Sequence, residues 1–253
     1  MGVLSSMPPI EITPDELKPF GVKWQVKKSL SRKPPNSSSQ LGNVFDSKVG
    51  KALATFLGGV EIIVPTQFAI RPTKDDIVEV GPVRIVGGVR PQNFDVGYRP
   101  DGVRFAFDSK TLNDTKSVKK NYQNMINDLG TEATTVHTRF PYAVVAFMVV
   151  IPKPCLPSAQ RNALTRTLER LTGRASPIDS AHKAEANALV LWDPFTGAID
   201  PAWPENGSPL RIEAFSSQVQ RHYFDRYKGL PPHDVDDPKL DAEHELEQAS
   251  AED

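Results

Sequence analysis

Hydrophobic residues recur at helical spacing in the first well-patterned part of the chain. The apolar positions of residues 49–60 end at Gly58-Gly59, which predicts a helix that begins near Asp46. Asp46 or Ser47 then occupies the N-cap position, where a short polar side chain satisfies free backbone N–H groups. Under this interpretation Asp46→Ala would cost about 1 kcal/mol of stability and leave catalytic activity largely intact.

The middle of the chain is predicted to form strands. VEIIVP at 60–65 and IVEVGPVRIVGG at 77–88 are short, rich in β-branched residues and bounded by Pro or Gly. Residues 93–112 have the pattern of a hairpin, with the arms FDVGYR and VRFAFDSK and the turn Pro100-Asp101-Gly102.

Helical and strand patterns alternate in the second half of the chain. Residues 114–130 predict a helix that Gly130 would cap, and the apolar run at 142–151 predicts a strand buried on both faces of a sheet. A helix at 158–171, a strand at 188–193 and a last helix at about 216–227 follow. This order predicts an α/β fold with a mixed central β-sheet flanked by helices.

Composition divides the chain into three parts. Residues 1–44 are rich in Pro, Ser and Lys and predict a flexible, irregular N-terminal arm with at most short elements. Residues 45–230 are interpreted as a single α/β domain, and residues 231–253 as a disordered acidic tail. From Asp234 onward the chain holds nine acidic residues and one lysine, whereas residues 1–233 hold 29 basic and 22 acidic residues. A basic body suits a polyanionic partner, and the tail is either a competitor for that surface or a solvated segment without a role.

Several classes of protein are excluded or disfavoured. The single cysteine, Cys155, excludes an intrachain disulfide and a CxxC zinc site. The chain contains no P-loop, GxGxxG, GxSxG or HExxH motif. No signal peptide is apparent, and the longest apolar run has ten residues, half of what a membrane span needs. We therefore expect a cytoplasmic protein without a membrane partner.

The tetrapeptide FDSK occurs twice, at residues 45–48 and 107–110. The acid-x-Lys triplet occurs five times in the chain, so context must decide which copy carries chemistry. In the second copy, Asp108 and Lys110 lie on the same face of the predicted strand. Asp95 lies on the other arm of the hairpin, almost directly across from Asp108. Two carboxylates and a lysine suit a Mg²⁺ site that acts on a phosphate ester, although a surface hairpin with scattered charges is the alternative.

These residues resemble the motif of the PD-(D/E)XK (restriction-endonuclease-like) nuclease superfamily over about residues 46–151. An Asp on one strand, then a hydrophobic strand that ends in acid-x-Lys, then a helix and a further strand are typical of that family. Phe94 replaces the literal proline of the motif. The resemblance implies a restriction-endonuclease-like core.

The resemblance also implies roles for individual residues. Asp95 and Asp108 would ligate Mg²⁺, the backbone carbonyl of Ser109 would be a further ligand, and Lys110 would orient the attacking water. The family often adds an acid from the first helix. The acids near that position are Asp46 and Glu61, which lie at the two ends of the predicted helix.

The function expected from this resemblance is a magnesium-dependent endonuclease that cleaves DNA phosphodiester bonds, of a restriction or phage-defence type. One catalytic centre per chain favours a homodimer for cutting both strands. The alternative is a catalytically inactive nuclease-like module that binds nucleic acid or protein.

Two other groups of residues are weaker candidates. His137 and Arg139 are candidates for the edge of the cleft, although a lone His is more often structural. Basic and aromatic residues of two helices either contact the DNA backbone, lie on a solvated face or pack on the core. They are Lys116, Lys119, Lys120 and Gln123, and Arg221, His222, Tyr223, Arg226, Tyr227 and Lys228.

Overall fold

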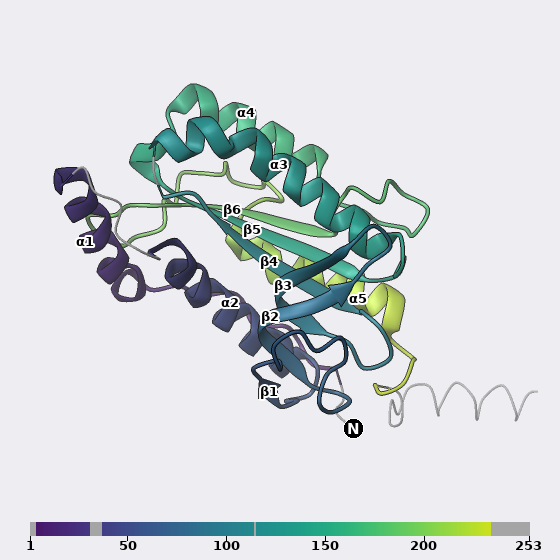
Figure 1. Cartoon of the computed structure of the whole chain (residues 1–253). Coiled ribbons are helices and arrows are strands. Elements are labelled where there is room, and N and C mark those ends of the chain that lie inside the picture. Colours follow the sequence, from purple (N-terminus) through teal and green to yellow (C-terminus); the bar gives the residue numbers. More distant parts are fainter. Residues whose placement is uncertain (1–3, 31–36, 114, 234–253) are drawn as a thin grey trace, which may run out of the picture.

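The computed structural model describes residues 4–30, 37–113 and 115–233, and its described part forms one six-stranded mixed sheet with five α-helices (Figure 1). The helices are α1 (Pro14–Leu30), α2 (Ser37–Phe56), α3 (Thr115–His137), α4 (Ser158–Arg170) and α5 (Ile212–Tyr227). The strands are β1 (Ile62–Ile63), β2 (Val78–Val86), β3 (Pro91–Tyr98), β4 (Phe105–Thr111), β5 (Val144–Pro152) and β6 (Ala186–Trp192). The expected α/β fold with a mixed sheet is confirmed.

The strands lie in the sheet in the order in which they occur along the chain, from β1 to β6. β2, β3 and β4 form an antiparallel meander, and β4, β5 and β6 run parallel. The expected hairpin is present, with Val96 paired to Phe107 and Tyr98 to Phe105. Parallel neighbours need a crossover, and α3 and α4 supply the two crossovers of the parallel half.

Helices cover both faces of the sheet (Figure 1). α2 and α5 pack on one face, where Phe45 and Phe215 join Phe107 in one apolar cluster. α3 and α4 pack on the other, where Leu129 and Leu164 join a second cluster. All nine residues of β5 are buried, which confirms the expectation that this strand is covered on both faces.

The N-terminal region is more regular than its composition indicates. Residues Pro14–Leu30 form a helix of 17 residues, so the expected irregular arm with at most short elements was wrong. Met7, Ile10 and Leu17 are buried in the same core cluster as α2 and α5. The backbone N–H of Met7 donates to Gln220 Oε1 at 2.8 Å. Apolar residues spaced among the prolines and lysines are sufficient to fix this segment on the core.

The helix expected to begin at Asp46 begins at Ser37 instead. Asp46 therefore lies in the interior of α2 and is buried, so its assignment as an N-cap was wrong. Leu41 and Phe45 are both buried and continue the apolar stripe upstream. The apolar face of the helix thus extends into the segment that was interpreted as part of the arm.

Two other expected boundaries differ from the structure. α3 continues through Gly130 to His137, so the C-cap assigned to Gly130 was wrong. The buried Ala133 and Val136 continue the apolar face, and burial of that face outweighs the modest cost of a glycine inside a helix. The strand expected at 60–65 is reduced to Ile62–Ile63.

Residues 234–253, which contain most of the predicted acidic tail, lie outside the described residues. The division into arm, domain and tail remains a prediction. None of the helices in the described ranges is both long and apolar enough to cross a membrane.

Candidate active site

The predicted carboxylates lie where β3 and β4 separate. Pairing between the two strands ends at Val96 and Phe107, and Asp95 and Asp108 are the next residue on each strand. Beyond this point β3 pairs with β2, and β4 pairs with β5. The register of β2 against β3 also shifts between Val80 and Val83, next to Asp95. Such a bulge bends the strand and redirects side chains, and here it accompanies a fork in the sheet that holds the two acids.

Asp95 is held by the residue that follows Asp108. The backbone N–H and the hydroxyl of Ser109 both donate to Asp95 Oδ2, at 2.9 and 3.1 Å. The carboxyl groups of Asp95 and Asp108 also interact, and this interaction raises the pKa of Asp95 and lowers that of Asp108. The two acids and Ser109 therefore form one connected group across the fork.

Lys110 lies between two carboxylates. Its ammonium group contacts Asp108 Oδ2 directly and donates to Glu132 Oε1 at 2.7 Å. The side chain of Lys110 is 21% exposed and that of Glu132 is 7% exposed. The lysine is thus largely withdrawn from solvent, which strengthens its charge interactions.

A third acid approaches the fork from the helix layer. Asp46 on α2 interacts electrostatically with Asp95, and the nearby Ser109 side chain lowers the pKa of Asp46. A short Asp reaches the sheet because α2 lies very close to it. A Cβ atom at Gly42 would stand 2.8 Å from Ser109 Oγ, and one at Gly50 would stand 2.3 Å from a methyl of Val80. The two glycines, one turn before and one turn after Asp46, permit this close approach.

Burial and mutual repulsion make these acids weak. Desolvation, followed by the nearby charge of Asp95, raises the pKa of Asp46 to about 8. Desolvation and then the interaction with Asp108 raise the pKa of Asp95 to about 8. Desolvation also raises the pKa of Asp108 to about 6, against the opposing effects of Asp95 and Lys110. At neutral pH the cluster therefore retains protons that a bound cation would displace.

The pKa of Lys110 is raised, which favours the charged form of the side chain. Burial by itself would lower it, but the carboxylates of Asp108 and Glu132 together raise the pKa above its usual value. Lys110 is consequently an ammonium ion at neutral pH. It can donate hydrogen bonds and steady negative charge, but it does not accept a proton.

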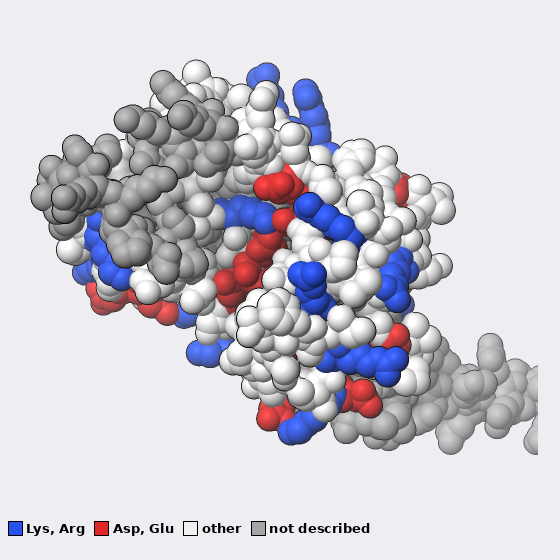
Figure 2. All heavy atoms as spheres, in the orientation of Figure 1, with Lys and Arg blue, Asp and Glu red and all other residues white. Residues whose placement is uncertain are grey.

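The carboxylates at the fork contact hydrogen-bond donors and are not already arranged as a metal-binding site. Among the described residues, no three Asp, Glu, His or Cys side chains are grouped closely enough to surround a cation. However, Asp46 Oδ1 and Glu132 Oε2 are buried and have no hydrogen-bond partner. Buried oxygens of this kind are costly unless something binds them. Figure 2 shows a face of the molecule on which acidic and basic side chains gather in a hollow.

All four residues that the sequence singled out thus lie together, namely Asp95, Asp108, Ser109 and Lys110. Their chemical roles remain predictions. The sequence interpretation assigned Asp46 to a helix cap, although it noted this acid near the family's first-helix position, and it missed Glu132. A signal for the first was the Gly-x₃-Asp-x₃-Gly spacing of residues 42–50. A signal for the second was a lone acid on the apolar face that continues beyond Gly130.

Other candidates lie elsewhere. His137 is buried and its side chain lies 3.1 Å from that of Glu185, so it is part of an internal hydrogen-bond network and does not border the fork. Glu61 is paired with Lys74 at 2.7 Å on the surface. The basic and aromatic residues of α5 mostly pack inward. His222, Tyr223 and Tyr227 are buried, and Arg226 contacts Glu185 at 2.8 Å. The side chains of Lys116, Lys119 and Lys120 lie outside the described residues.

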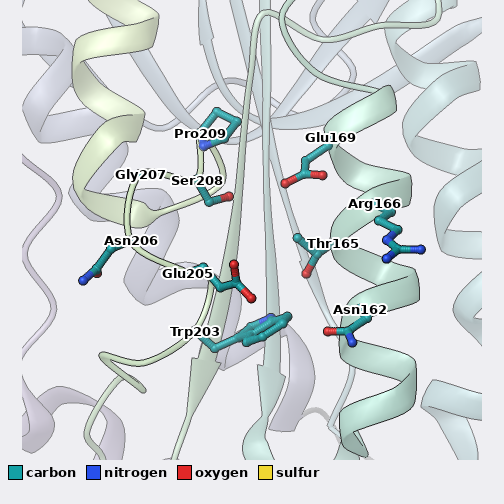
Figure 3. A pocket seen from close by; sticks show the side chains of 10 residues that line it. All are labelled: Asn162, Thr165, Arg166, Glu169, Trp203, Glu205, Asn206, Gly207, Ser208 and Pro209. Atoms are coloured by element: carbon teal, nitrogen blue, oxygen red, sulfur yellow. The ribbon is translucent and has the colours of Figure 1, made fainter.

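A separate pocket of about 450 Å³ lies between α4 and residues 203–209 (Figure 3). Thr165 and Glu169 point into it from the helix, and Glu205 and Trp203 from the opposite side (Figure 3). Both of these glutamates are exposed. None of the residues predicted to act on a substrate lines this pocket, so it does not extend the cluster at the fork.

No family model, curated protein or solved structure matches this chain. The cluster at the fork joins three acids, a lysine and its glutamate partner, brought together from α2, β3, β4 and α3.

Proposed function

We propose that this protein is a magnesium-dependent endonuclease with a restriction-endonuclease-like core, which cleaves phosphodiester bonds of DNA. The observation that carries the proposal is the convergence of Asp46, Asp95, Asp108 and Lys110 at one fork of the sheet. Buried acids with raised pKa values beside a lysine are typical of sites that perform chemistry.

The order of elements supports the same proposal. α2 precedes the β2–β3–β4 meander, and α3 then leads to β5, which lies parallel to β4. This is the arrangement that the family resemblance implies around its motif. Asp46 takes the place of the additional acid that the family often draws from its first helix.

The donor groups at the fork fit Mg²⁺. Magnesium prefers oxygen ligands and usually keeps several waters, so it needs few protein groups. Asp95 and Asp108 would hold it, and Asp46 has a buried oxygen without a partner. The N–H of Ser109 points toward Asp95, and in a strand the C=O of a residue points to the same side as its N–H. The Ser109 carbonyl therefore also faces the fork, in agreement with its predicted role as a ligand.

When bound, the metal would supply positive charge for the scissile phosphate and a more acidic water. The contribution of Lys110 follows from its own charge. As an ammonium group it would donate to the attacking water and orient it toward phosphorus, and it would steady negative charge that develops in the transition state. Since Lys110 keeps its proton, the proton of the water passes to another acceptor or to solvent.

The charge distribution supports a nucleic-acid substrate. Residues 1–233 contain 29 basic and 22 acidic residues, an excess that favours association with a polyanion. A cut through both strands would require a second copy of this centre, so we propose a homodimer on duplex DNA. A restriction or phage-defence role is the proposed biological setting.

A cleavage assay tests the proposal directly. Supercoiled plasmid and labelled DNA and RNA oligonucleotides would be incubated with the protein in Mg²⁺, with EDTA as control. We expect metal-dependent cleavage of DNA that disappears in Asp95→Asn and Asp108→Asn variants with unchanged circular dichroism. Binding of DNA without cleavage under any divalent metal would favour the inactive binding module. Cleavage of RNA alone would correct the substrate.

A further inference from the structure

We infer that Glu132 is a positioning residue that keeps Lys110 at the site when Asp108 turns to a cation. This inference rests on the proposed function, because it assigns a task to Glu132 within the same reaction. Glu132 lies on α3, outside the hairpin that carries the motif.

Lys110 contacts two carboxylates that lie on different elements. One ammonium group joins Asp108 to Glu132, and both carboxylates are mostly buried. Asp108 is shared, since it also interacts with Asp95 across the fork. Glu132 contacts Lys110 at 2.7 Å through Oε1, while its Oε2 has no hydrogen-bond partner. Glu132 therefore has spare acceptor capacity for the lysine.

The charge of a bound cation would affect the contacts of Lys110 with Asp108 and with Glu132 differently. A divalent cation on Asp108 and an ammonium ion on the same carboxylate repel each other, and burial strengthens this repulsion. Lys110 must then leave Asp108 or weaken its contact. With Glu132 present, the ammonium can shift toward that carboxylate and still face the fork. Without it, the lysine either stays on Asp108 and opposes the cation or swings into solvent.

The position of Glu132 is fixed by its surroundings. One turn further along α3, the backbone carbonyl of Thr135 accepts from the N–H of Gly88 at 2.8 Å. Gly87 and Gly88 lie in the β2–β3 turn, where an added Cβ would clash with Thr135 and Thr138. The tip of this hairpin is thus packed tightly against α3. The helix that carries Glu132 and the strand that carries Asp95 are therefore held in a fixed relation, as positioning requires.

A double-mutant cycle tests the inference. The variants are Glu132→Gln, Lys110→Ala and the double variant, with Asp128→Asn as a matched control for loss of an exposed carboxylate on α3. Titration calorimetry would measure Mg²⁺ affinity of the full-length, DNA-free protein. DNA cleavage would give kcat and KM, and thermal melting would report folding.

In the lysine-containing protein, Glu132→Gln should weaken Mg²⁺ binding at least fivefold. It should also lower kcat at least tenfold while KM for DNA stays within about twofold, since positioning acts on the transition state. In the Lys110→Ala background the same substitution should change Mg²⁺ affinity by less than about twofold, because no lysine remains to be held. Asp128→Asn should match the wild type throughout. Glu132→Asp keeps the charge and should retain more Mg²⁺ affinity than Glu132→Gln, which provides a second test if the glutamine variant folds poorly.

Equal losses of Mg²⁺ affinity with and without Lys110 would overturn the inference, and so would a Glu132→Gln protein that binds Mg²⁺ and cuts like wild type. In both cases the proposed nuclease function would stand. A wild-type protein that neither binds Mg²⁺ nor cuts DNA would instead remove the proposed function, and the task of Glu132 with it.

Discussion

Ser109 donates both its backbone N–H and its hydroxyl to a single oxygen of Asp95, across the gap where β3 and β4 no longer pair. The side chain of Asp95 thus takes over a backbone donor that a paired strand would have satisfied. This substitution of a carboxylate for a strand partner holds the fork open and keeps Asp95 directed toward Asp108.

Ser109→Ala tests how much the hydroxyl of Ser109 contributes to fixing the Asp95 side chain. The variant keeps the backbone N–H bond to Asp95, so we expect a loss of about 1 kcal/mol of stability. Cleavage should fall less than tenfold, because the acids and Lys110 remain. Thermal melting and initial cleavage rates measure the two effects. A loss of activity as large as that of Asp95→Asn would mean that the hydroxyl takes part in the chemistry directly.

Asp46→Ala should abolish or strongly reduce metal-dependent cleavage, by about 10²-fold or more. The sequence interpretation, with Asp46 as a helix cap, predicts the opposite. The structure reverses this expectation because Asp46 is buried in α2 and interacts with Asp95 and Ser109. Glu61→Gln provides the comparison, since Glu61 lies on the surface in a pair with Lys74. If both variants fold and cut as wild type does, Asp46 has no part in the site.

The raised pKa values predict how stability depends on pH. Asp46 and Asp95 each have a folded pKa of about 8, against 3.8 for an ordinary aspartate. The protonated form is favoured by folding, so this contribution is fully present below about pH 4 and is lost as pH rises to about 8. In EDTA the free energy of unfolding should fall between pH 6 and pH 8, by up to about 1.4 kcal/mol per pH unit for each group that keeps its proton.

Melting temperatures measured in EDTA and in Mg²⁺ check this prediction. The stabilisation by Mg²⁺ should be larger at pH 8 than at pH 6, because fewer protons then compete with the cation. Asp95→Asn should flatten the pH dependence in EDTA, since its amide does not titrate. Identical pH profiles for the variant and the wild type would show that the cluster does not hold these protons.

Lys110→Ala separates binding from chemistry. With Ca²⁺ in place of Mg²⁺, the variant should bind DNA about as tightly as wild type. In Mg²⁺ it should cut about 10²–10³-fold more slowly, the range typical of losing one donor that stabilises negative charge in the transition state. Filter binding and gel-based cleavage rates give the two values. A matching loss of DNA affinity would assign Lys110 to substrate binding.

The hairpin and its motif could be predicted from the sequence because their signals are local. The turn at residues 100–102 and the alternation along β4 place Asp95 opposite Asp108 without knowledge of the rest of the fold. Glu132 could not be placed in this way. It meets Lys110 only because the crossover packs α3 over β4, and a glycine within that helix was interpreted as its end.

Asp46 was misassigned for a different physical reason. A short acid next to a Ser has the same local pattern at a helix cap and in a helix interior, and the two differ only in where the helix begins. The serine-rich stretch before it indicated a flexible arm. Burial of Leu41 and Phe45 on the sheet decides in favour of a longer helix, and that packing is a property of the whole fold.

The glycines on either side of Asp46 have a consequence for how this protein can change in evolution. Gly42 and Gly50 set the spacing between α2 and the sheet, and that spacing matches the length of an aspartate. A glutamate at position 46 would need the helix to retreat by about the length of one methylene. Among homologues, positions 42, 46 and 50 should therefore vary as a set, with small residues accompanying Asp and bulkier ones accompanying Glu.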